Sequence, residues 1–106
     1  MNAKQILEDN FTEKNESFLY YLHEKATFNR DAFKKLYESI RAAAEDGVEI
    51  SRTAQQITHV YGQILKCFLY HFDKNDKYKI VNIPENYNKM IEYLEKSVEY
   101  YFTTRI

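Results

Sequence analysis

The longest strongly periodic stretch of the chain, from Ser51 to Phe72, constrains the fold more than any other segment. Large apolar residues recur along it at spacings that place them on one side of an α-helix. These residues are Ile57, Val60, Tyr61, Ile64, Phe68 and Phe72. At about 100° per residue, the other side collects polar and aromatic side chains, namely Arg52, His59, Gln63, Lys66 and Tyr70. The stretch is therefore predicted to be an amphipathic helix with one face in a core.

Such a helix needs partners, because ordering a backbone costs entropy that one apolar stripe in water does not offset. The composition indicates what those partners are. Only two Gly and one Pro occur among the 106 residues. A β-rich chain of this length needs turn residues every few positions, so the shortage favours long helices with few connections.

We predict an all-α, single-domain four-helix up-down bundle over residues 1–106. Four segments with an apolar stripe are expected to be its helices, at about 3–25, 29–46, 52–72 and 84–103. The segment at about 78–83 contains β-branched residues, but no second strand is evident to pair with it. It is expected to be an extended connector that lies across the bundle.

Local signals mark some of the helix ends. Asn29 is a favourable N-cap, with Phe28 and Phe33 placed as a hydrophobic staple around it. Gly47 stands where a left-handed C-terminal cap is expected. The first helix has weak helix formers in its middle, so a break near residues 10–12 is an alternative to one continuous helix.

The central and last helices carry signals of other kinds. The central helix has two competing caps, Ser51 and Thr53. Gly62 lies inside it and is expected to mark a close crossing with another helix. Pro84 suits the first turn of the last helix, because a proline there loses no helical hydrogen bond.

Charge and cysteine content exclude several classes of protein. The formal net charge is −1, so broad electrostatic attraction to DNA or anionic lipid is not expected. Cys67 is the only cysteine, which excludes an internal disulfide and is typical of a reducing compartment. The chain has no apolar run of membrane-spanning length and no secretory signal pattern at its N-terminus. A cytoplasmic location without membrane contact is expected.

The sequence has no Gly-rich phosphate loop, no paired Cys and no His pair at the i, i+4 spacing of a helical zinc site. His71 is expected to be a core-edge histidine whose partner is a backbone carbonyl, and Cys67 to be a small buried hydrophobe. The segment Asp73–Lys77 has the composition of a turn. It resembles the start of a calcium loop only superficially, because Lys77 occupies a ligand position and Pro84 stands where the closing Glu belongs. We expect no cofactor and no metal.

The chain contains ten Tyr, and this abundance favours a protein-binding function. Tyr and Arg are enriched at interfaces because they combine contact area with hydrogen bonding. One predicted contact ridge consists of Arg52, His59, Gln63, Lys66 and Tyr70, and a second consists of Tyr93 and Tyr100 on the last helix. Tyr20 and Tyr21 would extend the surface. The interpretation is a non-enzymatic module that masks or inhibits a partner protein, with the profile of bacterial immunity proteins, antitoxins and phage-encoded inhibitors.

Two alternatives stay open. Arg52 and His59, with six residues between them on one predicted helix of a small all-helical domain, resemble the Arg-x(4–6)-His signature of HEPN ribonucleases. That resemblance implies that both side chains act on the 2′-OH and phosphate of RNA, usually across a homodimer. Thr53 stands after the Arg where the family more often has Asn, Asp or His. The other alternative is a homo-oligomeric structural or scaffold protein.

Overall fold

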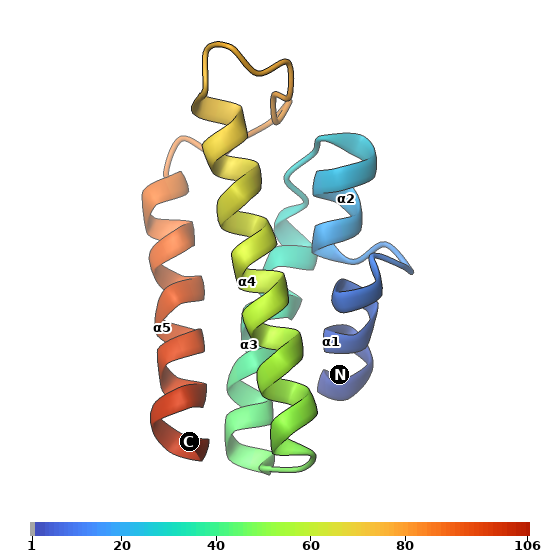
Figure 1. Ribbon diagram of the computed structural model, residues 1–106, viewed down its shortest axis with the longest axis vertical. Coiled ribbons are helices and arrows are strands. Elements are labelled where there is room, and N and C mark those ends of the chain that lie inside the picture. The colour runs from blue at the N-terminus through green and yellow to red at the C-terminus, as the bar shows by residue number, and fades with distance from the viewer. Residues whose placement is uncertain (1) are drawn as a thin grey trace.

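The computed structural model describes residues 2–106, which form five α-helices and, within that range, no β-strand. The helices are α1 (Ala3–Thr12), α2 (Phe18–Lys25), α3 (Arg30–Asp46), α4 (Ile50–Phe72) and α5 (Tyr87–Arg105). α4 runs opposite to α3 and α5, and α1 and α2 follow each other on the side away from α5 (Figure 1). The all-helical prediction is confirmed, but five helices replace the expected four. No helix in residues 2–106 combines the length and apolar composition that a membrane span requires.

The expected first helix, at about 3–25, is two helices separated by a five-residue turn, 13–17. α1 ends where Glu13 adopts a left-handed conformation with φ 57°, so the alternative of a break near residues 10–12 is the one observed. Asn10, which is buried, bridges the break: its Nδ2 donates to the Ile6 carbonyl at 2.9 Å, and its Oδ1 accepts from the Leu19 N–H at 3.0 Å. One amide side chain thus satisfies backbone groups of both helices.

α3 follows the sequence signals at both ends. Asn29 caps it by accepting from the Ala32 N–H at 2.9 Å, and the rings of Phe28 and Phe33 lie 5.1 Å apart, as the predicted staple requires. Gly47 ends the helix with φ 68°. Arg105, from the end of α5, donates hydrogen bonds to the Ala44 and Glu45 carbonyls, which are among the acceptors that a helix end leaves free.

α4 differs from expectation at its start and middle. Neither Ser51 nor Thr53 caps it: the N-cap is Glu49, in a left-handed conformation and without a side-chain capping bond. Thr53 instead donates to the Val48 carbonyl at 3.4 Å. The close helix crossing expected at Gly62 is absent, because no atom of a neighbouring helix lies within 4 Å of the position that a Cβ would take.

α5 begins at Tyr87, so the expected start at about 84 is wrong. Pro84 lies in a turn before the helix, and its carbonyl accepts from the Tyr87 N–H at 3.1 Å. The connector at about 78–83 has no strand assignment and packs on the loop after α2. There the Val81 N–H donates to the Ala26 carbonyl at 2.8 Å, and Asn82 exchanges two hydrogen bonds with the Phe28 backbone.

The buried apolar side chains form one cluster to which all five helices contribute. Phe18, Phe28 and Phe33 pack against one another with ring centroids 4.9 to 5.1 Å apart. The apolar stripe of α4 lies in this cluster except near its end, where Phe72 is 52% exposed. The prediction that Phe72 is buried is therefore wrong. The Phe72 ring lies over Tyr87 at 5.1 Å, at the rim of the core.

Candidate protein-binding surface

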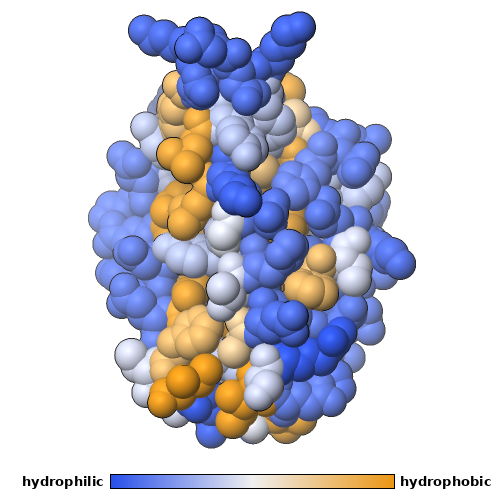
Figure 2. Space-filling view, in the orientation of Figure 1, coloured by the Kyte–Doolittle hydropathy of each residue, from blue (hydrophilic) through white to orange (hydrophobic). Residues whose placement is uncertain are grey.

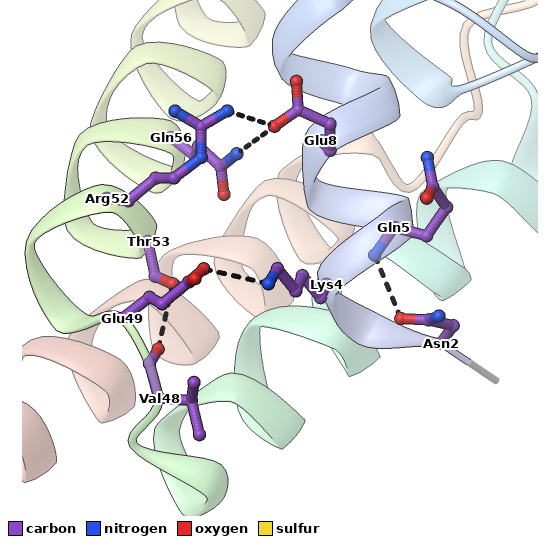
Figure 3. Close-up of polar contacts among 9 residues, drawn as sticks. All are labelled: Asn2, Lys4, Gln5, Glu8, Val48, Glu49, Arg52, Thr53 and Gln56. Atoms are coloured by element: carbon purple, nitrogen blue, oxygen red, sulfur yellow. Dashed lines mark hydrogen bonds and ion pairs between the residues drawn. The ribbon is translucent and has the colours of Figure 1, made fainter.

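Arg52, the first residue of the predicted α4 ridge, bonds within the molecule (Figure 3). Its Nη2 lies 2.5 Å from Glu8 Oε1 of α1, and Gln56 Nε2 donates to the same oxygen at 2.8 Å. Nearby, Lys4 Nζ of α1 lies 3.1 Å from Glu49 Oε2. The side chain of Arg52 therefore joins α4 to α1, and its charge is already balanced by a carboxylate.

His59 lies on the same edge of α4 and has a different neighbour. Its exposed ring contacts Phe11 of α1 edge-on, with centroids 5.0 Å apart. Arg52 precedes His59 by seven residues, a rise of about 10 Å along the helix axis. The two side chains thus meet different residues of α1: the Arg52 guanidinium pairs with Glu8, and the His59 imidazole lies against Phe11.

The rest of the α4 ridge continues along this edge. Gln63 is half-buried, whereas Lys66 and Tyr70 are exposed. Since Arg52 and His59 contact α1, this ridge lies on the α1 side of α4. That these five residues contact a partner stays a prediction. The residues lie on a different face of the molecule from Tyr93 and Tyr100 of α5.

Tyr93 and Tyr100 of α5 contact α3. The Tyr93 ring, 49% exposed, lies 6.1 Å from the ring of Tyr37. The guanidinium of Arg41 lies 5.4 Å from the ring centroid of Tyr100, at cation–π distance. Buried Ser97 fixes this arrangement, since its Oγ accepts from Arg41 Nε at 3.2 Å and donates to the Tyr93 carbonyl at 3.0 Å.

These contacts align two stripes of side chains along the junction of α3 and α5. In each stripe the residues are spaced four, three and four positions apart, so they share one side of their helix. We call the set the α3–α5 face: Arg30, Lys34, Tyr37 and Arg41 of α3, with Lys89, Tyr93, Lys96 and Tyr100 of α5. All eight positions hold Arg, Lys or Tyr.

Most residues of this face are not identified as contact residues when each helix is considered alone. Tyr37 reads as part of the apolar stripe of its helix, and Lys34 and Arg41 read as members of a solvated flank of alternating charge. The matching spacing of Arg, Lys and Tyr in the two helices is the signal that would have revealed them. It becomes meaningful only once α3 and α5 are known to be neighbours.

The remaining reactive side chains have structural roles. His71 accepts a hydrogen bond at Nδ1 from the Ile80 N–H at 2.8 Å, so the carbonyl partner expected for it is wrong. Burial, with Lys79 nearby, lowers the pKa of His71 below its usual 6.5. Cys67 is buried, as predicted, and burial raises the pKa of its thiol. No cluster of His, Cys, Asp and Glu suited to a metal ion occurs within residues 2–106.

The predicted turn at Asp73–Lys77 is present, and a lysine ammonium occupies it. Asp73 Oδ1 accepts from the Asn75 N–H at 2.9 Å. Lys79 Nζ donates to the carbonyls of Asp73 at 3.0 Å and Asp76 at 2.9 Å. The positively charged group that these carbonyl oxygens bind is thus the ammonium of Lys79.

Comparison with models of known protein families, with curated proteins and with solved structures gave no significant match.

Proposed function

We propose that this chain is a non-enzymatic module that binds a partner protein through the α3–α5 face. The observation that carries the proposal is the composition of that face, where all eight positions are Arg, Lys or Tyr. Tyr and Arg are the residues most enriched, with Trp, among those that contribute most of the binding energy at protein interfaces. Here they stand in register on two helices, and a rigid scaffold presents them.

The charge of the face selects the chemistry of the partner. Its cations are Arg30, Lys34, Arg41, Lys89 and Lys96. Of these five cations, only Lys96 forms an ion pair with another described residue, Glu92 at 3.3 Å. Because the whole chain carries a net charge of −1, this positive charge is local. An acidic protein surface would meet complementary potential here, which favours rapid and specific association.

The geometry of the rings favours a protein over a nucleic acid. Proteins that bind single strands offer free aromatic faces on which bases stack. The Tyr100 ring has Arg41 at cation–π distance, and the Tyr93 ring packs against Tyr37. A phenol group can also donate and accept hydrogen bonds, which suits a tyrosine to a protein interface.

The face is held in place before any partner arrives. Ser97 and Tyr100 both contact the Arg41 guanidinium, so this long side chain loses less conformational freedom on binding than a free arginine would. On this proposal α1 and α2 together form the first member of a four-helix up-down scaffold, and α5, its last member, carries half of the face. Masking or inhibition of the partner, in the manner of an immunity protein or antitoxin, completes the proposal, with the cytoplasm as its compartment.

Capture of the partner from lysate of the source cell tests this proposal. We expect Arg41→Ala and Tyr93→Ala each to weaken capture by about 1–2 kcal/mol without lowering the melting temperature by a comparable amount. Tyr20→Ala removes a half-buried tyrosine of α2 that packs edge-on against Tyr21 and lies outside the α3–α5 face. It is the matched control and should leave capture unchanged. Rising salt should weaken capture of an acidic partner.

Three results would contradict the proposal. They are equal capture by wild type and both variants, loss of the captured material on nuclease treatment, and capture that is insensitive to salt. The first would show that another face makes the contact. The second would replace the protein partner with a nucleic acid.

The ribonuclease alternative has its own test. It requires Arg52 and His59 to act together, whereas Arg52 is paired with Glu8 and His59 lies against Phe11. We expect purified protein to leave RNA intact. Cleavage that disappears in His59→Ala but persists in Arg41→Ala would establish the ribonuclease and overturn the non-enzymatic proposal.

A further inference from the structure

The outward side of α4 carries an apolar seam that other helices cover only in part, since the Phe72 ring packs on Tyr87 of α5 and Leu65 is half-buried. Gly62, Leu65, Leu69 and Phe72 follow one another at spacings of three, four and three, the repeat with which helices pair in coiled coils. We call these four residues the α4 seam. Leu69 is 70% exposed and Phe72 is 52% exposed. Figure 2 shows hydrophobic residues gathered along α4 and its junction with α5, on the face that Figure 1 presents.

Gly62 has no role inside the molecule that would explain it. A glycine in a helix interior is unfavourable relative to alanine. Its backbone has no left-handed conformation, and nothing lies within 4 Å of where a Cβ would be. A position without a side chain lets another backbone come close. Within an apolar seam, Gly62 marks the place where a second helix would approach most closely.

The two flanks of the seam carry opposite charges. Lys66 is exposed on the flank that faces away from α5. Exposed carboxylates of α5 lie along the other flank, at Glu92, Glu95 and Glu99, of which Glu92 also pairs with Lys96 of its own helix at 3.3 Å. Glu95 and Glu99 lie near Tyr61 of α4, whose pKa is raised first by burial and then by these carboxylates.

Lys66 of α4 and two of the α5 carboxylates lie at the same height along the helix axes. Lys66 is five residues beyond Tyr61, about 7.5 Å further along α4. Because α5 runs in the opposite direction, that level corresponds to Glu92 and Glu95 rather than to Glu99.

We propose that a second copy of this chain packs on the α4 seam, with its helices parallel to those of the first about a two-fold axis along the seam. Such an axis exchanges the flanks, so Lys66 of each copy faces Glu92 and Glu95 of the other. Leu65 and Leu69 then meet their own counterparts.

An antiparallel arrangement is less favourable both for the apolar contacts of the seam and for the charges on its flanks. It would set Leu69 against Gln55, seven residues on the other side of Gly62. It would also place α5 against α5, so that the carboxylates of one copy face those of the other. The parallel dimer is therefore the occupant that the charges select.

Sedimentation velocity of the full chain over a range of concentrations tests the dimer. We expect a reversible monomer–dimer equilibrium in the wild type and a monomer for Leu69→Glu. Lys66→Glu should weaken the dimer by tenfold or more, and the exchange Lys66→Glu with Glu95→Lys should restore it. Val81→Glu, at an exposed apolar residue of the connector, is the matched control and should dimerise like the wild type.

Cross-linking reports the orientation. Leu69→Cys should form a covalent dimer on mild oxidation, because residues 69 of a parallel pair lie together, whereas the native Cys67 is buried and does not compete. A wild type that stays monomeric at about 1 mM would overturn the proposal. So would a dimer that survives Leu69→Glu, or a Gln55→Cys, Leu69→Cys double variant that cross-links only between residues 55 and 69. None of these variants touches the α3–α5 face, so partner capture is tested separately.

Discussion

At the scale of single residues, polar side chains bond backbone groups at helix ends and in loops. Asn10 serves both α1 and α2, Asn82 bonds the Phe28 backbone, and Arg105 bonds the last carbonyls of α3. Within residues 2–106 no buried side-chain nitrogen or oxygen lacks a hydrogen-bond partner. The contacts of Asn82 and Arg105 join segments far apart in the chain.

The two glycines should respond to alanine in opposite directions. Gly62→Ala should stabilise the fold by about 1 kcal/mol, because the helix gains propensity and the new Cβ meets nothing within 4 Å. Gly47→Ala should destabilise it by about 1–2 kcal/mol, since φ is 68° and a Cβ would lie 2.6 Å from Arg105 Cζ. Urea unfolding at low protein concentration, where the monomer dominates, measures both. A loss of stability in Gly62→Ala would show an unrecognised internal contact.

His71 should titrate below pH 6.5. Its folded pKa is lowered by burial and, secondarily, by Lys79, so the fold favours the neutral ring that accepts from the Ile80 N–H. The stability linked to this group is therefore fully present above pH 6.5, its unfolded value, and is lost as the pH falls toward the folded pKa. NMR titration of the His71 ring protons measures the midpoint. His71→Asn, which keeps an acceptor without titrating there, should flatten the loss; a midpoint above 6.5 would contradict this.

Local chemistry explains which residue roles the sequence predicts. The cap at Asn29, the staple of Phe28 with Phe33 and the glycine at 47 involve neighbours within a few positions, and all three predictions are confirmed. The partner predicted for His71 is wrong because the actual donor, Ile80, lies beyond a turn. The fold places that donor, and sequence spacing does not.

At the scale of elements, the apolar stripes predict the helices well and their ends poorly. The stripe of α4 is buried over most of its length, whereas the start of α4 and the break between α1 and α2 differ from the simplest prediction. Glu13 and Glu49 adopt left-handed conformations at these two places. Such conformations favour glycine, so no composition signal announces them.

The link between α1 and α2 should depend on Asn10. Asn10→Ala removes the acceptor of the buried Leu19 N–H and should destabilise the fold by about 1–3 kcal/mol. Asn88→Ala, at an exposed position of α5, is the matched control and should change stability by less than about 0.5 kcal/mol. Denaturant unfolding compares them, and hydrogen exchange at Leu19 reports the local effect. Equal stability of the two variants would show that the break holds without this side chain.

At the scale of the whole molecule, two surfaces of different chemistry lie on different helix faces. The α3–α5 face is basic and rich in tyrosine, and the α4 seam is apolar with charged flanks. The sequence indicates Tyr93, Tyr100 and Lys66 as exposed on their own helices. It does not indicate that Arg41 lies over Tyr100, since that contact depends on α3 and α5 being neighbours. Helix pairing, which is set by the packing of all the stripes together, is the part that one sequence does not determine.

NMR of the isotopically labelled chain with its captured partner tests whether the α3–α5 face makes the contact. The resonances of this face should shift or broaden, with the Tyr93 ring and the Arg41 guanidinium among the most affected, while those of Tyr20 and His59 should stay in place. Changes confined to α1, α2 and the edge of α4 around Arg52 and His59, with the α3–α5 face unperturbed, would contradict this prediction.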